Sequence, residues 1–139
     1  MPVARGSDAS QEALRRYGAK RISVITPYMP AGDTQVRRFF TDCGFEIVHL
    51  KGLKCMSPVL IAHVSERELR DAIVEVNGPD VDAIIQVGTN LAMARLAGIA
   101  EFWLDKPVLA INTCIYWWAL RQNGIGDKID GFGSLLLKH

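Results

Sequence analysis

The chain has 139 residues and a mass of 15.4 kDa, the size of one ordinary domain. Its 16 Lys and Arg residues nearly balance its 15 Asp and Glu residues, and the formal charge is +1. This balance excludes a strongly basic nucleic-acid-binding protein and an acidic tail, while 49% hydrophobic and 22% charged residues exclude a disordered chain.

No stretch of the sequence is expected to span a membrane. The most apolar segment, residues 81–104, contains Asp82, Arg95 and Glu101, and these charges break any candidate span. The first eight residues lack the apolar core of a signal peptide.

The three cysteines, Cys43, Cys55 and Cys114, are widely spaced. They form no CxxC motif and no Cys/His spacing of the kind that binds zinc. We therefore expect a cytoplasmic protein with reduced thiols, without a disulfide framework or a metal site.

Apolar runs of about six residues alternate with helical patterns, which is typical of β–α units around a parallel sheet. Asp8 and Gln11 predict a capping box for the first helix, and Ser65 and Glu68 predict another further on. In chain order we expect a helix over 9–17, a strand over 21–26, a helix over 33–43, a strand over 45–50, a helix over 65–76, a strand over 81–87, a helix over 91–104, a strand over 107–111 and a helix over 114–123. The tail, residues 131–137, either adds a short strand or packs as coil.

The predicted fold class is α/β: a single domain, residues 1–139, with a four-stranded parallel sheet and helices on both faces. In such sheets ligands bind beyond the carboxyl ends of the strands. The candidate ligand-binding turns are therefore residues 26–30, 52–57, 88–90 and 112–113.

The turn of Gly88, Thr89 and Asn90 is the most informative of these. Gly88 permits a tight turn and a close approach of ligand to backbone. We expect the following amides to face outward at the N-terminus of the next helix, where the helix dipole favours an anion. The triplet therefore suits a small carboxylate, and the alternative is that Thr89 or Asn90 merely caps the helix.

Tyr28 places a phenol at the end of the first strand. The phenol can donate a hydrogen bond to a carboxylate or an enolate-like oxygen, or the ring can simply pack at the sheet edge. Asn112 and Thr113 either donate to the same site or cap the last helix.

No catalytic residue can be assigned from the residues alone. Cys114 lies near a helix N-terminus but among apolar neighbours, which favours a buried structural thiol. Cys55, in a loop near the predicted ligand edge, is the best candidate for a reactive thiol, and the alternative is that it has no role. The sequence contains neither GxGxxG nor GxxxxGK[ST], so no nucleotide site is expected.

These turns together resemble the aspartate/glutamate racemase superfamily, and most closely its branch of maleate cis-trans isomerases and arylmalonate decarboxylases. The resemblance covers nearly the whole chain, and it lies in the order of the motifs rather than in any single one. The matching segments are residues 21–28, 82–91, 106–112, 118–121 and 131–136.

The resemblance implies a flavodoxin-like half-domain. Proteins of that family have two similar α/β halves with the active site between them, and this chain looks like the second, C-terminal half only. It implies substrate binding by Tyr28, Gly88, Thr89 and Asn90, with no cofactor. In the isomerases and racemases each half supplies one catalytic cysteine, and the matching position here is Gly88. The decarboxylases have glycine in one turn, but in the other half, so the arrangement here is reversed or lost.

We therefore expect a cofactor-independent isomerase or decarboxylase acting on a small (di)carboxylic acid, of the maleate isomerase or arylmalonate decarboxylase type. The alternative is a catalytically inactive carboxylate-binding or partner-interaction module, because Gly88 offers no thiol. The expected partners are a small carboxylate ligand and either a matching first-half domain or further copies of the chain. The apolar composition predicts that such an interface buries part of the Trp117 and Trp118 region or of the helices beside the ligand edge. No partnership with nucleic acid or membrane is expected.

Overall fold

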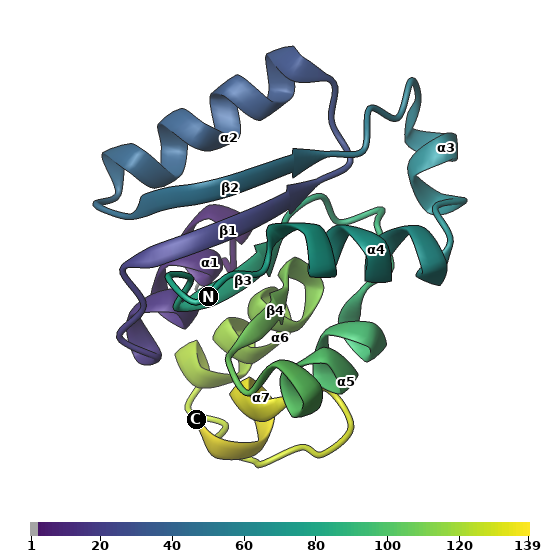
Figure 1. Ribbon diagram of the computed structural model, residues 1–139. Helices are drawn as coiled ribbons and strands as arrows, with labels where there is room; N and C mark the ends of the chain where they lie inside the picture. Colours follow the sequence, from purple (N-terminus) through teal and green to yellow (C-terminus); the bar gives the residue numbers. More distant parts are fainter. Residues whose placement is uncertain (1–2) are drawn as a thin grey trace.

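The computed structural model describes residues 3–139. Four parallel strands form one sheet in the order β2-β1-β3-β4, with helices on both faces (Figure 1), which confirms the predicted fold class. The elements are α1 (Gly6–Arg16), β1 (Arg21–Thr26), α2 (Pro30–Asp42), β2 (Glu46–Gly52), α3 (Pro58–Ala62), α4 (Glu66–Val76), β3 (Ala83–Gln86), α5 (Ala94–Leu104), β4 (Val108–Ala110), α6 (Ile111–Gln122) and α7 (Ser134–Lys138).

The strand register brings the predicted ligand-binding turns together. Thr26 pairs with Gly52 across β1 and β2, and Gln86 lies between β1 and β4 in the ladder. All four strands run in one direction, so their carboxyl ends share one edge of the sheet. The turns that follow β1 and β3 therefore meet there, as the sequence predicts.

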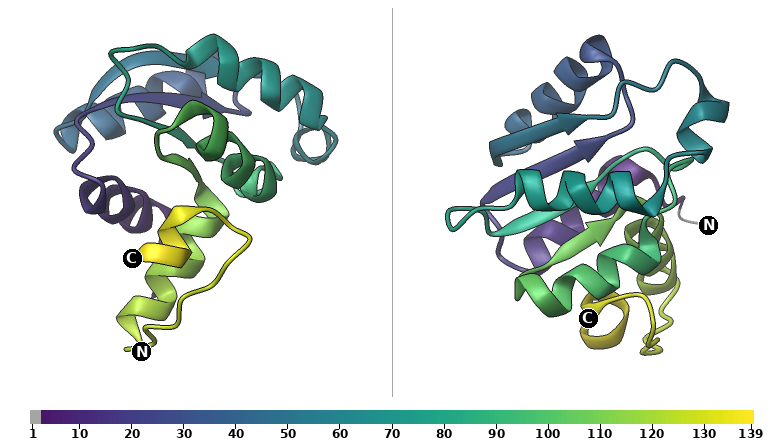
Figure 2. Two further views of the ribbon diagram at one scale, coloured as in Figure 1. Left: turned by 60° about the horizontal axis from the view of Figure 1, so that its bottom comes forward. Right: turned by 45° about the vertical axis from the view of Figure 1, so that its right-hand side comes forward.

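Two apolar cores lie on opposite faces of the sheet, because successive strand residues point to opposite sides. Ile22 and Val24 of β1 contribute to the core beneath α1, α2, α6 and α7, and Ile25 contributes to the core beneath α4 and α5. Figure 2 shows these helix layers on either side of the sheet. Residues 22–26 of β1 are fully buried, so this strand anchors both layers.

Several helical predictions were wrong; α2 and α6, for example, begin at Pro30 and Ile111, three residues earlier than expected. The first helix begins at Gly6 and no side chain caps it, so Asp8 and Gln11 form no capping box; Gln11 instead donates to the Ser7 carbonyl at 3.1 Å. The tail forms a short helix, α7, instead of a strand or coil, because Leu135 and Leu136 are buried against the α1–α6 core. The helix after β3 begins at Ala94, three residues later than expected.

The two neighbouring tryptophans pack within this chain. Trp117 is fully buried in the core of α1 and α6, and Trp118 is half-buried against it. The expectation that Trp117 takes part in an interface between molecules is therefore not supported by its position. The exposed apolar side chains lie elsewhere, most prominently Phe102 of α5, which is 91% exposed.

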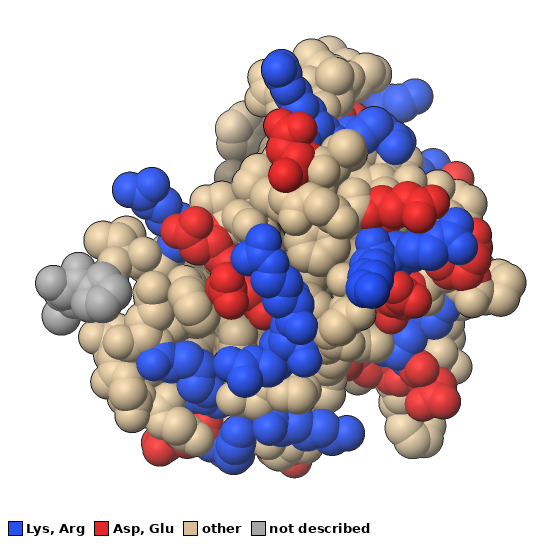
Figure 3. Space-filling model, turned by 90° about the vertical axis from the view of Figure 1, so that its left-hand side faces the viewer, with Lys and Arg blue, Asp and Glu red and all other residues tan. Residues whose placement is uncertain are grey.

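Charged side chains of both signs share the surface. On the face shown in Figure 3, basic and acidic groups lie beside one another. Arg21, for example, lies 3.3 Å from a carboxylate oxygen of Glu46 and 3.4 Å from one of Asp80. This interspersion accords with the small net charge.

We predict that Asp82 makes folding stability depend on pH. Its carboxylate accepts hydrogen bonds from the backbone N–H groups of Arg21 at 2.9 Å and Lys20 at 3.0 Å, and these bonds lower its pKa. Because the folded pKa lies below the unfolded value of about 3.9, this stabilisation is complete above that value and is lost as pH falls through the folded pKa. Asp82→Asn should lower the urea midpoint at pH 7 and flatten its fall below about pH 4. The exposed Asp71→Asn serves as control, and equal acid dependence in both variants would contradict the prediction.

Candidate functional site

A cavity of about 610 Å³ opens at the carboxyl edge of the sheet. Three of the four predicted site residues, Tyr28, Gly88 and Thr89, line it, and Asn90 follows on the same turn. The remaining wall comes from α1, α2, Val87 and Ile111, and it combines neutral polar groups with apolar ones such as Val36 and Phe39. None of the described lining residues is charged, so any anion held here is held by neutral donors.

The turn after β3 is fixed through its carbonyl groups. Gln86 is fully buried, and its Nε2 donates to the carbonyls of Val87 at 2.7 Å and Gly88 at 2.8 Å. Asn112, at the start of α6, donates from Nδ2 to the Thr89 carbonyl at 3.0 Å. Asn112 was predicted to lie near the site, but Gln86 was not. The sequence signal for Gln86 is a polar residue at the end of an otherwise apolar strand.

The N–H groups of this turn remain available. Across residues 3–139, no hydrogen bond involves the backbone N–H of Gly88, Thr89 or Asn90, whereas their neighbour Val87 donates to the Ile25 carbonyl at 2.9 Å. Consecutive free backbone N–H groups in a turn form an anion-binding concavity. The turn is therefore chemically suited to a carboxylate.

The prediction that the N–H groups of this turn lie at the N-terminus of the next helix was wrong. Met93 is the N-cap residue of α5 and no side chain caps the helix, so neither Thr89 nor Asn90 serves as a cap. Leu91 and Met93 are buried in the core beneath α4 and α5, and this packing separates the turn from the helix. Its N–H groups, and not the end of α5, provide the polarity of the site.

The alternative prediction that Asn112 or Thr113 caps the last helix was wrong. The helix α6 begins at Ile111, directly after β4, with Ala110 as an N-cap residue whose side chain makes no capping bond. Asn112 supports the turn through the Thr89 carbonyl, and Thr113 is buried. Neither caps the helix.

Tyr28 lies close to Gly88. A Cβ atom placed on Gly88 would lie 3.6 Å from the Tyr28 hydroxyl oxygen and 2.6 Å from Cγ of Pro27. Gly88 also has a φ of +92°, a conformation that favours glycine. The two positions predicted to act together are therefore adjacent, and the space above Gly88 is enclosed by Pro27 and the phenol.

The thiols lie outside this cavity. Cys114 is fully buried, and burial raises its pKa to about 12. Burial also raises the pKa of Cys43 and Cys55, so neither is activated as a thiolate. The Cys55 backbone N–H donates to the Pro27 carbonyl at 2.9 Å, but Cys55 does not line the cavity. Its predicted reactivity gains no support from this setting.

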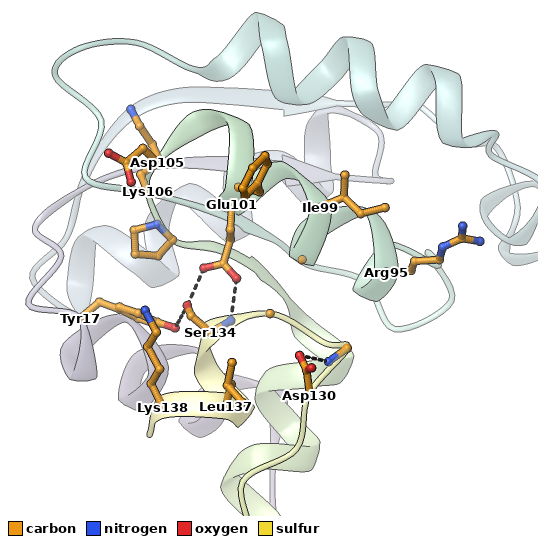
Figure 4. A pocket seen from close by; sticks show the side chains of 15 residues that line it. Tyr17, Arg95, Ile99, Glu101, Asp105, Lys106, Asp130, Ser134, Leu137 and Lys138 are labelled. Atoms are coloured by element: carbon orange, nitrogen blue, oxygen red, sulfur yellow. Dashed lines mark hydrogen bonds between the residues drawn. The ribbon is translucent and has the colours of Figure 1, made fainter.

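A second cavity, of about 760 Å³, lies between α5 and the C-terminal segment (Figure 4). Its central polar groups satisfy one another: the Tyr17 and Ser134 hydroxyls lie 2.5 Å apart, and Ser134 donates to Glu101 from Oγ at 2.6 Å and from its backbone N–H at 2.8 Å. Burial raises the pKa of Tyr17 above its usual range. This network holds α7 against α5 and α1, so we assign it a structural role.

Neither a metal site nor a membrane-spanning helix is found among residues 3–139. No group of three or more His, Cys, Asp or Glu residues within 3–139 is placed to hold a metal ion. Among the described helices, none combines the length and apolar character needed to cross a membrane.

These features define an α/β domain with a candidate anion-binding turn at the carboxyl edge of a parallel sheet. The family model for arylmalonate decarboxylase matches residues 1–136. The chain therefore belongs to the arylmalonate decarboxylase family, within the branch that the sequence motifs indicate.

Known relatives extend well beyond this chain. It is 25% identical over 138 residues to the maleate isomerase of Alcaligenes faecalis, covering 98% of this chain and 54% of that protein. The solved maleate isomerase of Pseudomonas putida S16 aligns with a TM-score of 0.90 at 25% identity, covering 96% of this chain and 54% of that one. A solved arylmalonate decarboxylase aligns with a TM-score of 0.85 at 25% identity, covering 94% and 59%. The chain thus spans about half the length of these relatives.

We predict that Ser134→Ala lowers the free energy of unfolding by about 1–3 kcal/mol, because Tyr17 and Glu101 each lose their hydrogen bond with the Ser134 hydroxyl in a partly buried setting. Urea denaturation followed by circular dichroism measures the change. Ser7→Ala, which removes an exposed hydroxyl, is the matched control. Equal midpoints for the two variants would contradict the structural role of the network.

We predict that Gly88→Ala is more destabilising than Gly124→Ala. Both glycines have positive φ, +92° and +74°, but a Cβ atom at Gly124 meets nothing within 4 Å. The positive φ costs each variant about 1–3 kcal/mol, and only Gly88→Ala must also displace Pro27 or move the turn. Adding Pro27→Ala to each variant should reduce the difference in stability between them. The denaturation midpoints of the two single and the two double variants test this. Equal losses at the two glycines would show that the contact with Pro27 is unimportant.

Proposed function

We propose that this chain is one half of a cofactor-independent enzyme that acts on a small (di)carboxylic acid, of the maleate isomerase or arylmalonate decarboxylase type. In this proposal the turn of Gly88, Thr89 and Asn90 binds a substrate carboxylate, and Tyr28 donates a further hydrogen bond. The observation that carries it is a turn with three N–H groups that make no hydrogen bond among residues 3–139, whose first residue, Gly88, lies beside the Tyr28 phenol.

Neutral donors are well suited to this role. Backbone N–H groups fixed by their carbonyl partners need little reorganisation when charge develops on a substrate oxygen. Gln86 and Asn112 supply that fixing. The same donors that bind a carboxylate can stabilise the enediolate-like oxygen left when a neighbouring carbon loses a proton or carbon dioxide.

The reacting thiol must come from elsewhere in this proposal. Gly88 carries no side chain, and no cysteine lines the described cavity. A matching first-half domain would close the cavity and supply the group that transfers the proton or attacks the substrate. We place the enzyme in the cytoplasm, where three unpaired cysteines remain reduced.

The apolar wall of the cavity bears on the choice of substrate. Val36, Phe39 and Val87 lie beside the carboxylate-binding turn, and such a wall stabilises an apolar substituent by removing it from water. An arylmalonate offers that substituent, whereas maleate is polar at both ends. We therefore expect phenylmalonate to bind more tightly than maleate.

Titration of the isotope-labelled chain, followed by NMR, tests the binding site. Phenylmalonate should shift the amide signals of residues 88–90 with roughly millimolar affinity, because a few hydrogen bonds are offset by the cost of association. Tyr28→Phe should weaken binding up to about tenfold, whereas the exposed Tyr116→Phe should not. Saturable shifts confined to other parts of the chain would contradict the proposal.

Turnover assays test the source of the thiol. The isolated chain should neither decarboxylate phenylmalonate nor isomerise maleate at a measurable rate, because it lacks the opposing wall and its thiol. Replacing Cys43, Cys55 and Cys114 with Ser in turn provides the control. Robust activity that survives all three changes would contradict thiol chemistry, and activity lost only in Cys55→Ser would assign the role to that loop. Binding without turnover, even after a first-half domain is supplied, would favour the inactive carboxylate-binding module.

A further inference from the structure

The Tyr28 side chain spans two glycines, one at its base and one at its tip. A Cβ atom on Gly32 would lie 2.7 Å from Cβ and 3.0 Å from Cγ of Tyr28, and one on Gly88 would lie 3.6 Å from the hydroxyl oxygen. The first turn of α2 therefore touches the root of the side chain, and the proposed binding turn touches its far end. The path of the ring depends on both glycines.

The Tyr28 backbone is held from two sides. Its N–H donates to Oγ1 of Thr26 at 3.1 Å, and its carbonyl accepts from the N–H of Lys54 at 3.1 Å. Thr26 is fully buried, and its hydroxyl donates to Oδ1 of Asp33. Because the hydroxyl proton points to Asp33, a lone pair of Oγ1 is left for the Tyr28 N–H.

The Asp33 carboxylate occupies space that is open because Gly52 has no side chain. A Cβ atom on Gly52, at the carboxyl end of β2, would lie 2.8 Å from Cγ of Asp33. Asp33 is half-buried and lies outside the cavity that Tyr28 lines. It therefore acts on the site only through Thr26 and the Tyr28 backbone.

We propose that Gly32 and Asp33, in the first turn of α2, are positioning residues for the Tyr28 phenol. Gly32 leaves room for the base of the ring, and Asp33 orients the Thr26 hydroxyl that holds the Tyr28 backbone. Since the hydroxyl is the most distant atom of the side chain, a small rotation at Cβ becomes a large displacement above Gly88. Misplacement of a positioned group by about 1 Å can cost about a hundredfold in reaction rate. The role rests on the proposed function, because the phenol matters only if it contacts substrate.

Fluorine NMR of the ligand-free chain tests the positioning directly. The three tyrosines are labelled as 3-fluorotyrosine, and Tyr28→Phe identifies the signal of position 28. Gly32→Ala should shift or broaden that signal and leave those of Tyr17 and Tyr116 unchanged. Gly126→Ala, where an added Cβ meets nothing within 4 Å, is the matched control. An unchanged Tyr28 signal in Gly32→Ala would overturn the proposal.

Conservative replacement separates orientation from general stability. Asp33→Ala should perturb the Tyr28 signal and weaken phenylmalonate binding up to about tenfold, the size of one strong hydrogen bond. Asp33→Asn should restore both, because its amide oxygen can still accept from Thr26. Asp71→Ala, on the exposed face of α4, controls for loss of a carboxylate. Equal defects in Asp33→Ala and Asp33→Asn would contradict an orienting role.

A double-mutant cycle links the positioning to the phenol. In the Tyr28→Phe background, Gly32→Ala should cause no further loss of phenylmalonate affinity, because the hydroxyl it misplaces is already absent. An additional loss of full size would overturn the proposal. If the unsubstituted chain does not bind phenylmalonate, the proposed function fails, and the ligand-free fluorine signals alone decide whether Gly32 and Asp33 set the position of the ring.

Discussion

The central strand β1 is the constraint on which the rest of the molecule depends. It pairs with β2 on one side and β3 on the other, and the residues from Ile22 to Thr26 are all buried. One face of the strand supports the α1–α6 core and the other the α4–α5 core. Pro27 and Tyr28 follow directly from its carboxyl end, so the buried strand also fixes their position. A flexible loop could not hold a phenol over one glycine while accommodating another at its base.

Sequence reasoning predicted the sheet well because apolar, β-branched runs mark buried parallel strands. It misplaced the start of α5 because Leu91 and Met93 continue the helical pattern, whereas in the fold they are buried before the helix begins. It found Tyr28, Gly88 and Thr89 together at one edge, since parallel strands align their carboxyl ends. It could not find the bonds that Gln86 donates to the turn or the bond that Asp33 accepts from Thr26, because such side-chain hydrogen bonds depend on backbone paths that periodicity does not encode.

The candidate site is polar, although none of its described lining residues is charged. Its carbonyls are occupied by amide side chains and its N–H groups are left open, so the turn presents partial positive charge that does not titrate. A lysine or arginine would hold a substrate and a product carboxylate alike. Fixed neutral donors bind more weakly, which suits the proposed half-site, because there an opposing surface would complete the site and a product must still be released.

The network of Tyr17, Ser134 and Glu101 joins residues from both ends of the chain. Ala13 and Leu14 of α1 share a core with Leu135 and Leu136, so α1 is covered in part by residues that lie far along the chain. During synthesis β1, β2 and β3 can pair in sequence, yet the apolar stripe of α1 is covered only after α6, its main packing partner, and then the segment after Gly133 have been made. Contacts of such long sequence separation slow folding. They also leave the nascent chain open to aggregation, so α1 calls for chaperone protection until α6 and α7 have been made.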